Sequence, residues 1–224
     1  ILTASGSIST TTSGTQNVKL GANAGDSIAS GGNYNVLIGD EAGTAITTGD
    51  NNVAIGFEAL KTEDEHSHNV AVGYQALRLQ DAGGNAYNVA VGSGAGKAIS
   101  TGVANTILGG LAGDALTTGG SNVAIGYNAL TTEDAHGLNV AIGFEALKTL
   151  NAGADAYNTA AGYQAGKSVT TGTFSTLIGG LAGDALADAD KNVAVGALAL
   201  STDTLGDKST AVGYGALSTQ NFSS

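Results

Sequence analysis

The sequence predicts an all-β fold, a parallel β-solenoid of about twelve coils, and three observations support this prediction. A glycine recurs at steps of 17 to 19 residues through nearly the whole chain. A short run of small and β-branched residues stands before most of these glycines, as a strand requires. The composition combines 36 glycines with only 5% aromatic residues, which suits thin, uniform layers and cannot fill a wide core.

One stretch shows the repeat most clearly. Residues 52–60 read Asn-Val-Ala-Ile-Gly-Phe-Glu-Ala-Leu and return almost unchanged as residues 139–147. These two copies define the structural motif: Asn52, Val53, Ala54, Ile55, Gly56, Ala59, Leu60, Asn139, Val140, Ile142, Gly143, Ala146 and Leu147. The twelve central glycines are Gly21, Gly39, Gly56, Gly73, Gly92, Gly109, Gly126, Gly143, Gly162, Gly179, Gly196 and Gly213. Helical-pair repeats need about 33 to 47 residues, so this shorter step indicates a solenoid coil with two short strands and two turns.

The chain divides into a short opening segment and one array. Residues 1–16 are rich in Ser, Thr and Gly, and we interpret them as a partial or degenerate coil or a linker. Residues 17–224 form a single repeat array, in which ten of the twelve coils begin with Asn. Identical Asn residues on successive coils are expected to hydrogen-bond in a ladder. The central glycine is expected where the chain bends with positive φ or approaches its neighbour closely.

A second regularity describes the core. The fourth residue after the central glycine is Gly in two coils, Leu in the next two, and so on to the end. After Gly, a larger apolar residue follows three positions later: Ile28, Ile46, Ile99, Leu116, Val169 and Leu186. After Leu, that position is usually polar: Glu63, Gln80, Glu133 and Asp203. Each coil therefore supplies about one large side chain to a narrow core, and four coils make a super-repeat of 70 residues.

The strands also predict association between chains. Successive strand residues point to opposite faces, so Val53 and Ile55 share one face and Ala54 takes the other. Both faces are apolar in most coils, and a thin roll covers only one of them with its own interior. A second copy is therefore expected to cover the other face. We expect Asp in place of Ala124 and Ala141 to prevent the oligomer, although the sequence leaves open which face lines the roll.

Composition and charge exclude several partners. The net charge of −11 is spread along the chain and argues against nucleic acid and anionic membranes, because binding them requires clustered Lys and Arg. The chain has no cysteine, and so no disulfide framework or thiolate metal site. No apolar run approaches the roughly 18 residues of a membrane span, so we expect no membrane insertion in this segment. Without a signal peptide or an initiating Met, the chain reads as a segment of a longer protein.

The motif Asn-Val-Ala-Ile-Gly-x-x-Ala, as in residues 52–59, resembles the head repeat of trimeric autotransporter adhesins of the YadA type. The repeat is more similar to the repeat shafts of bacteriophage tail fibres in three features: its longer step, the variant in residues 69–77 and the loop at residues 117–119. The resemblance covers about residues 17–219 and implies three parallel chains, each a left-handed β-roll. The adhesin repeat is usually shorter than 17 to 19 residues, and the sequence shows no coiled-coil stalk, anchor or chaperone domain. A viral or a bacterial origin therefore stays open.

The densest group of potential ligands is residues 63–68, and residues 133–136 occupy the same place one super-repeat later. Two His residues with carboxylates suit Zn²⁺ or Ni²⁺, so the candidate metal cluster is Glu63, His66, His68 and His136. A solvated acidic loop is the simpler interpretation. We favour it and assign no metal and no other cofactor.

Aromatic residues follow the central glycine in half of the coils: Phe57, Tyr74, Tyr127, Phe144, Tyr163 and Tyr214. Another set precedes the strand: Tyr34, Tyr87 and Tyr157. Spaced aromatic faces can stack on sugar rings, so the first set is a candidate contact with a cell-surface glycan. Packing between adjacent coils is the simpler interpretation, and we favour it.

Together these patterns predict a structural and adhesive fibre segment. The first hypothesis is a trimeric bacteriophage tail-fibre shaft or head that presents a host-attachment surface, and the alternative is the head of a bacterial trimeric surface adhesin. Either would be extracellular, with copies of itself and a host cell-surface glycan or protein as partners. An ice-binding solenoid, suggested by Thr-rich turns, ranks below both. No convergent acid, base or nucleophile indicates an enzyme.

Overall fold

A computed structural model describes residues 14–220, so the interpretation of residues 1–16 falls almost entirely outside the described residues. Twelve parallel strands form one sheet in chain order, each hydrogen-bonded to the next. They are β1 (Val18–Leu20), β2 (Val36–Ile38), β3 (Val53–Ile55), β4 (Val70–Val72), β5 (Val89–Val91), β6 (Thr106–Leu108), β7 (Val123–Ile125), β8 (Val140–Ile142), β9 (Thr159–Ala161), β10 (Thr176–Ile178), β11 (Val193–Val195) and β12 (Thr210–Val212). No helix occurs in residues 14–220. The predicted all-β parallel solenoid is therefore confirmed.

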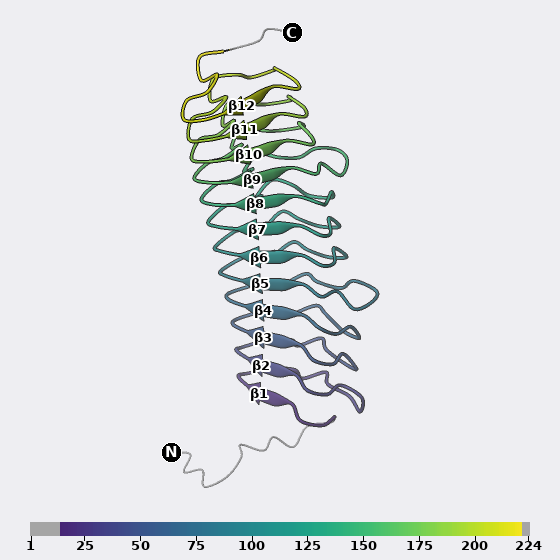
Figure 1. Cartoon of the computed structure of the whole chain (residues 1–224). Helices are drawn as coiled ribbons and strands as arrows, with labels where there is room; N and C mark the ends of the chain where they lie inside the picture. Colours follow the sequence, from purple (N-terminus) through teal and green to yellow (C-terminus); the bar gives the residue numbers. More distant parts are fainter. Residues whose placement is uncertain (1–13, 221–224) are drawn as a thin grey trace, which may run out of the picture.

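The coils stack as a column with β1 and β12 at opposite ends (Figure 1). Strand register is the same at every step, as where Val53 pairs with Val70 and Ala54 with Ala71. The two 19-residue steps keep this register too. Their extra residues enter longer loops that reach outward near β5 and β9 (Figure 1). With about 4.8 Å between neighbouring strands, the column is on the order of 55 Å long.

Each coil contains one three-residue strand, so the expectation of two strands per coil is wrong. The backbone after the central glycine enters the left-handed region, with φ of 53° at Glu58 and 50° at Leu60. An extended strand cannot include such residues. The turns still bond the coils together, because the Leu60 N–H donates to the Ala76 carbonyl oxygen at 3.0 Å. The side of the roll opposite the sheet is thus a ladder of turns.

The middle residue of each strand from β2 to β12 points into the roll and is buried. Ala124 and Ala141 are both 0% exposed in the core of the single chain. The expectation that Asp at these two positions acts on a contact between chains is therefore wrong. Asp would instead enter the interior of the roll, where an unpaired charge disrupts the fold of the chain itself.

The Gly–Leu alternation fills the core as predicted, but some coils contribute more than one large side chain. The second coil of each super-repeat also points a large strand residue inward: Leu37, Ile107 and Leu177. Gly43 makes room for this residue, because a Cβ there would lie 2.7 Å from Leu37 Cδ2 and 2.8 Å from Ile46 Cδ1. The chain thus uses two core arrangements, one with Gly at this position and one with Leu.

The Asn residues that open the coils form the expected ladder, although their side chains bond to backbone groups of neighbouring coils. The Asn105 Oδ1 accepts the Asn122 backbone N–H at 2.9 Å. The Asn105 Nδ2 donates to the Gly119 carbonyl oxygen at 2.9 Å. Asn105 and Asn122 are 0% exposed, and Gly119 is buried as well. Asn105 therefore satisfies two backbone groups that would otherwise be buried without a partner.

Candidate functional site

The outer strand face, formed by the first and third residues of all twelve strands, is the first candidate surface. These residues point away from the core, and every one of them is Val, Ile, Leu, Ala or Thr. Val89 and Ile142 are each 39% exposed, and Val212 at the end of the column is 69% exposed. In a chain of net charge −11, an uncharged apolar strip along the whole column is typical of a surface that contacts another molecule.

A row of aromatic side chains runs beside this face, after the central glycines. Phe57 stacks on Tyr74 with ring centroids 5.6 Å apart. Phe144 lies between Tyr127 and Tyr163, at 5.7 Å and 5.4 Å. The rings cover one another's faces across adjacent coils and leave their edges exposed, so packing between coils is one of their roles. The predicted glycan contact of Phe57, Tyr74, Tyr127, Phe144, Tyr163 and Tyr214 stays a prediction. In the stacked rings a sugar can reach only the edges and the end faces of each stack, since stacking on a sugar requires an open face. Tyr214 is 82% exposed and belongs to none of these stacks.

A second aromatic row lies before the strands. Tyr157 stacks on Phe174 with centroids 5.1 Å apart, and Tyr87 stacks on His68 at the same distance. Phe174 and the role of His68 were not predicted from the sequence. The signal was available, because both residues occupy the position just before the strand-opening Asn or Ser.

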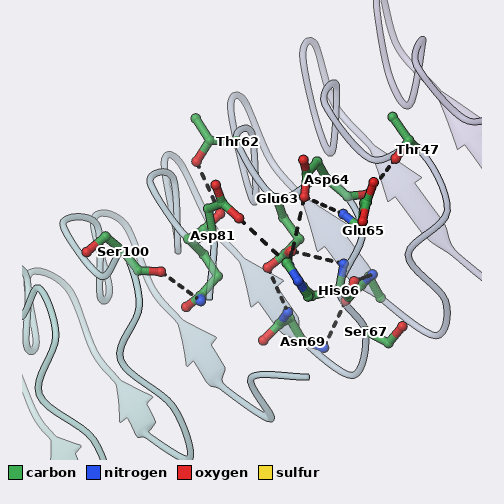
Figure 2. A network of polar contacts seen from close by, with 12 residues as sticks. Thr47, Thr62, Glu63, Asp64, Glu65, His66, Ser67, Asn69, Asp81 and Ser100 are labelled. Carbon is green, nitrogen blue, oxygen red and sulfur yellow. Dashed lines mark hydrogen bonds and ion pairs between the residues drawn. The ribbon is translucent and has the colours of Figure 1, made fainter. Parts of the chain in front are cut away.

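A polar group surrounds His66 in the loop after β3 (Figure 2). The His66 Nδ1 lies 2.9 Å from Glu63 Oε1 and 3.8 Å from Asp64 Oδ1. It also lies 3.8 Å from Asp81 Oδ1, which belongs to the next coil. The Glu63 side chain is wholly buried and that of His66 is 17% exposed, whereas Asp64 and Asp81 are about half exposed. We call these four residues the His66 group.

The four residues of the predicted metal cluster do not lie together. Glu63 and His66 are neighbours, whereas His68 stacks on Tyr87 and is not a member of the group. His136 belongs to a separate group with Glu133 and Asp134, one super-repeat further on. Asp81 was not predicted, because the ligands of one site were expected within one loop. A signal existed, since Asp81 stands 17 residues after Asp64, which is one coil step.

Burial raises the pKa of Glu63, and the hydrogen bonds from His66 oppose that effect. The Glu63 Oε1 accepts the backbone N–H of His66 at 3.2 Å, and its Oε2 accepts Nδ2 of Asn69 at 3.3 Å. A buried carboxylate accepts the backbone N–H three residues later in every super-repeat, in the pairs Glu63–His66, Glu133–His136 and Asp203–Gly206. These acids therefore anchor the loops from inside the roll.

Two further carboxylates, Glu58 and Glu145, bind cations across neighbouring coils. The Glu58 Oε1 lies 2.7 Å from Lys61 Nζ, and its Oε2 lies 2.7 Å from Arg78 Nε. The hydrogen bond from Lys61, helped by Gln75 and Arg78, lowers the pKa of Glu58 to about 2. Lys148 and Lys167 lower the pKa of Glu145 to about 2 in the same way. Both groups join neighbouring coils, and neither was predicted from the sequence.

In comparisons with known proteins, the chain matches no protein-family model, no curated protein and no solved structure. Over residues 14–220, the structure has no helix that is long and apolar enough to cross a lipid bilayer.

Proposed function

We propose that the chain is a segment of a trimeric fibre, a stiff extracellular shaft or head that presents a host-attachment surface on a virion. The observation that carries the proposal is the outer strand face, an uncharged apolar strip that runs the length of the column. A single roll leaves this strip in water, at a free-energy cost of about 25 cal/mol for each Å² of apolar surface. Association that covers the strip removes that cost.

A second copy of the chain is the partner that fits this strip. Copies arranged around an axis parallel to the column meet at equal coil levels, so their rows of outward strand side chains, mostly Val and Ile, have the same spacing along the whole length. The outer strand face contains no charged side chain that would repel its equivalent in a copy. Three copies, and not two, follow from the resemblance of the motif to trimeric adhesin heads and tail-fibre shafts.

Several features suit a mechanical role. The strand register is unbroken over eleven coil steps, and side-chain hydrogen bonds of the internal Asn ladder accompany most of them. Ion pairs such as Arg78–Glu58 and Lys167–Glu145 join neighbouring coils on the outside. A column fixed in this way resists bending, which favours a spacer between an anchoring part and an attachment surface.

The head of a bacterial trimeric surface adhesin is the second candidate, and the same outer strand face supports it. An ice-binding solenoid ranks lower, because it needs Thr hydroxyls free to contact ice. The hydroxyls of Thr47 and Thr117 instead donate to the carbonyl oxygens of Asp64 and Asp134 in the next coil. The proposal assigns no catalytic activity.

Charges on the outer strand face are expected to separate the chains. Asp in place of both Val123 and Ile125, the outward residues of β7, introduces two carboxylates into the contact between copies. We expect a folded particle of one chain mass by sedimentation equilibrium, because both side chains lie outside the roll and its core remains intact. Circular dichroism checks that the fold is kept.

The matched control adds the same two charges elsewhere. Asn85→Asp and Ala154→Asp place them in the two longer loops, at exposed positions away from the sheet. This control is expected to retain the mass of the wild-type protein. If the Val123→Asp/Ile125→Asp variant also retained that mass, the outer strand face would not be the contact between copies.

A further inference from the structure

The His66 group brings one imidazole nitrogen and three carboxylate oxygens within 4.8 Å of one another. The distances from His66 Nδ1 to the three oxygens are 2.9, 3.8 and 3.8 Å. Around a tetrahedral ion with bonds of about 2.0 Å, two ligand atoms lie about 3.3 Å apart. The three distances fall on either side of this value. We propose that Glu63, Asp64, His66 and Asp81 bind a divalent first-row transition-metal ion, for which Zn²⁺ is the reference.

The charges of the group favour a cation. Three carboxylates approach one another here, and within residues 14–220 their ion pairs all run to His66. Four cations, Lys61, Arg78, Lys148 and Lys167, instead pair with Glu58 and Glu145. Close like charges cost free energy unless a cation compensates them, and a divalent ion would compensate most of this charge.

The loop after β11 is equivalent to the loop that contains His66, but it has no His at that position. The loop after β11 keeps the buried carboxylate of Asp203, which accepts the Gly206 N–H at 3.0 Å. Gly206 stands where His66 stands in the earlier loop, and β11 and β12 still pair in the usual register. The loop therefore folds without the imidazole. The His66 imidazole and the Asp64 carboxylate, which Gly206 and Thr204 replace there, are therefore available to a ligand.

The donor atoms indicate the class of metal. One imidazole nitrogen with carboxylate oxygens suits Zn²⁺ and its first-row neighbours, whereas Ca²⁺ and Mg²⁺ prefer oxygen ligands alone. Asp64 and Asp81 are about half exposed, so an ion can enter from solvent. Because Asp81 comes from the coil of β4, the bound ion would fasten two coils together.

The loop after β7 offers an internal reference. Glu133, Asp134 and His136 form a similar group there. Asn151 stands 70 residues after Asp81, so the equivalent of the fourth ligand is an amide. This second group lacks one carboxylate and is expected to bind Zn²⁺ more weakly.

Isothermal titration of the full chain with Zn²⁺ tests the proposal. We expect one tighter site per chain and one weaker site. Asp81→Asn copies the second loop and should weaken the tighter site roughly ten-fold or more, because one of four ligands loses its charge. His66→Gly copies the loop after β11 and should remove that site. Glu65→Gln, an exposed acid of the same loop outside the group, is the matched control and should bind like wild type.

Thermal unfolding supplies a second readout. Zn²⁺ is expected to raise the Tm of wild type and of Glu65→Gln, and to raise that of His66→Gly much less. The proposal would be overturned by an absence of Zn²⁺ binding, by equal affinity in wild type and His66→Gly, or by Ca²⁺ binding as tightly as Zn²⁺. None of these outcomes changes the sedimentation mass, so the fibre proposal stands or falls separately.

Discussion

Valine in place of Gly126 is expected to destroy its coil and to lower the stability of the whole array. Gly126 has φ of 134°, a conformation that L side chains rarely adopt. A Cβ there would lie 2.3 Å from the carbonyl oxygen of Gly143 in the next coil, which is far inside van der Waals contact. Strain of this kind costs about 3 kcal/mol or more, so the Tm should fall by roughly 6 to 12 °C or further. Thermal unfolding followed by circular dichroism measures it.

Gly213 separates the two causes of this loss. It has a similar φ of 126°, but a Cβ there meets no atom within 4 Å. Gly213→Ala should therefore cost only the backbone strain, whereas Gly126→Ala should cost strain and clash together. Equal melting temperatures for these two Ala variants would show that close stacking of the glycines does not govern stability.

Alanine in place of Asn105 is the second large effect that we expect. The change leaves the Asn122 N–H and the Gly119 carbonyl oxygen without their side-chain partner, inside a buried ladder. Each unsatisfied buried backbone group costs about 1 to 3 kcal/mol, so the free energy of unfolding should fall by about 2 to 6 kcal/mol. Chemical denaturation at fixed protein concentration measures the change.

The chain provides a natural control for Asn105→Ala. Ser175 occupies the same position in a later coil, and its Oγ accepts the Asn192 backbone N–H at 3.1 Å. Asn105→Ser should therefore keep one of the two hydrogen bonds and lose roughly half as much stability as Asn105→Ala. If Ser and Ala proved equally destabilising, or if Ala had no effect, the Asn ladder would not stabilise the stack.

The sequence was sufficient to predict the solenoid, because its cause is local and repeated. The step of 17 to 19 residues, the Asn before ten of the twelve strands and the central glycine all recur where the structure needs them. The orientation of the strands was harder to predict. Ala54 and its neighbours Val53 and Ile55 are all apolar, so hydrophobicity alone could not show that the small residue lines the roll.

The polar groups were less predictable for a different reason. Glu63 reads as a solvated loop residue, yet it is 0% exposed because the loop folds over it and supplies hydrogen bonds. The contact between His66 and Asp81 depends on how successive coils stack, which the sequence of one loop does not contain. Contacts between coils follow from the 17-residue step only after the register is known.

The central claim is that copies of the chain cover the outer strand face, and the mass of the wild-type protein in solution tests it most directly. Sedimentation equilibrium is predicted to give three times the chain mass of 21.7 kDa, without dissociation on moderate dilution. A soluble, folded particle of a single chain mass would contradict the claim, because its apolar strip would then be stable in water without a partner.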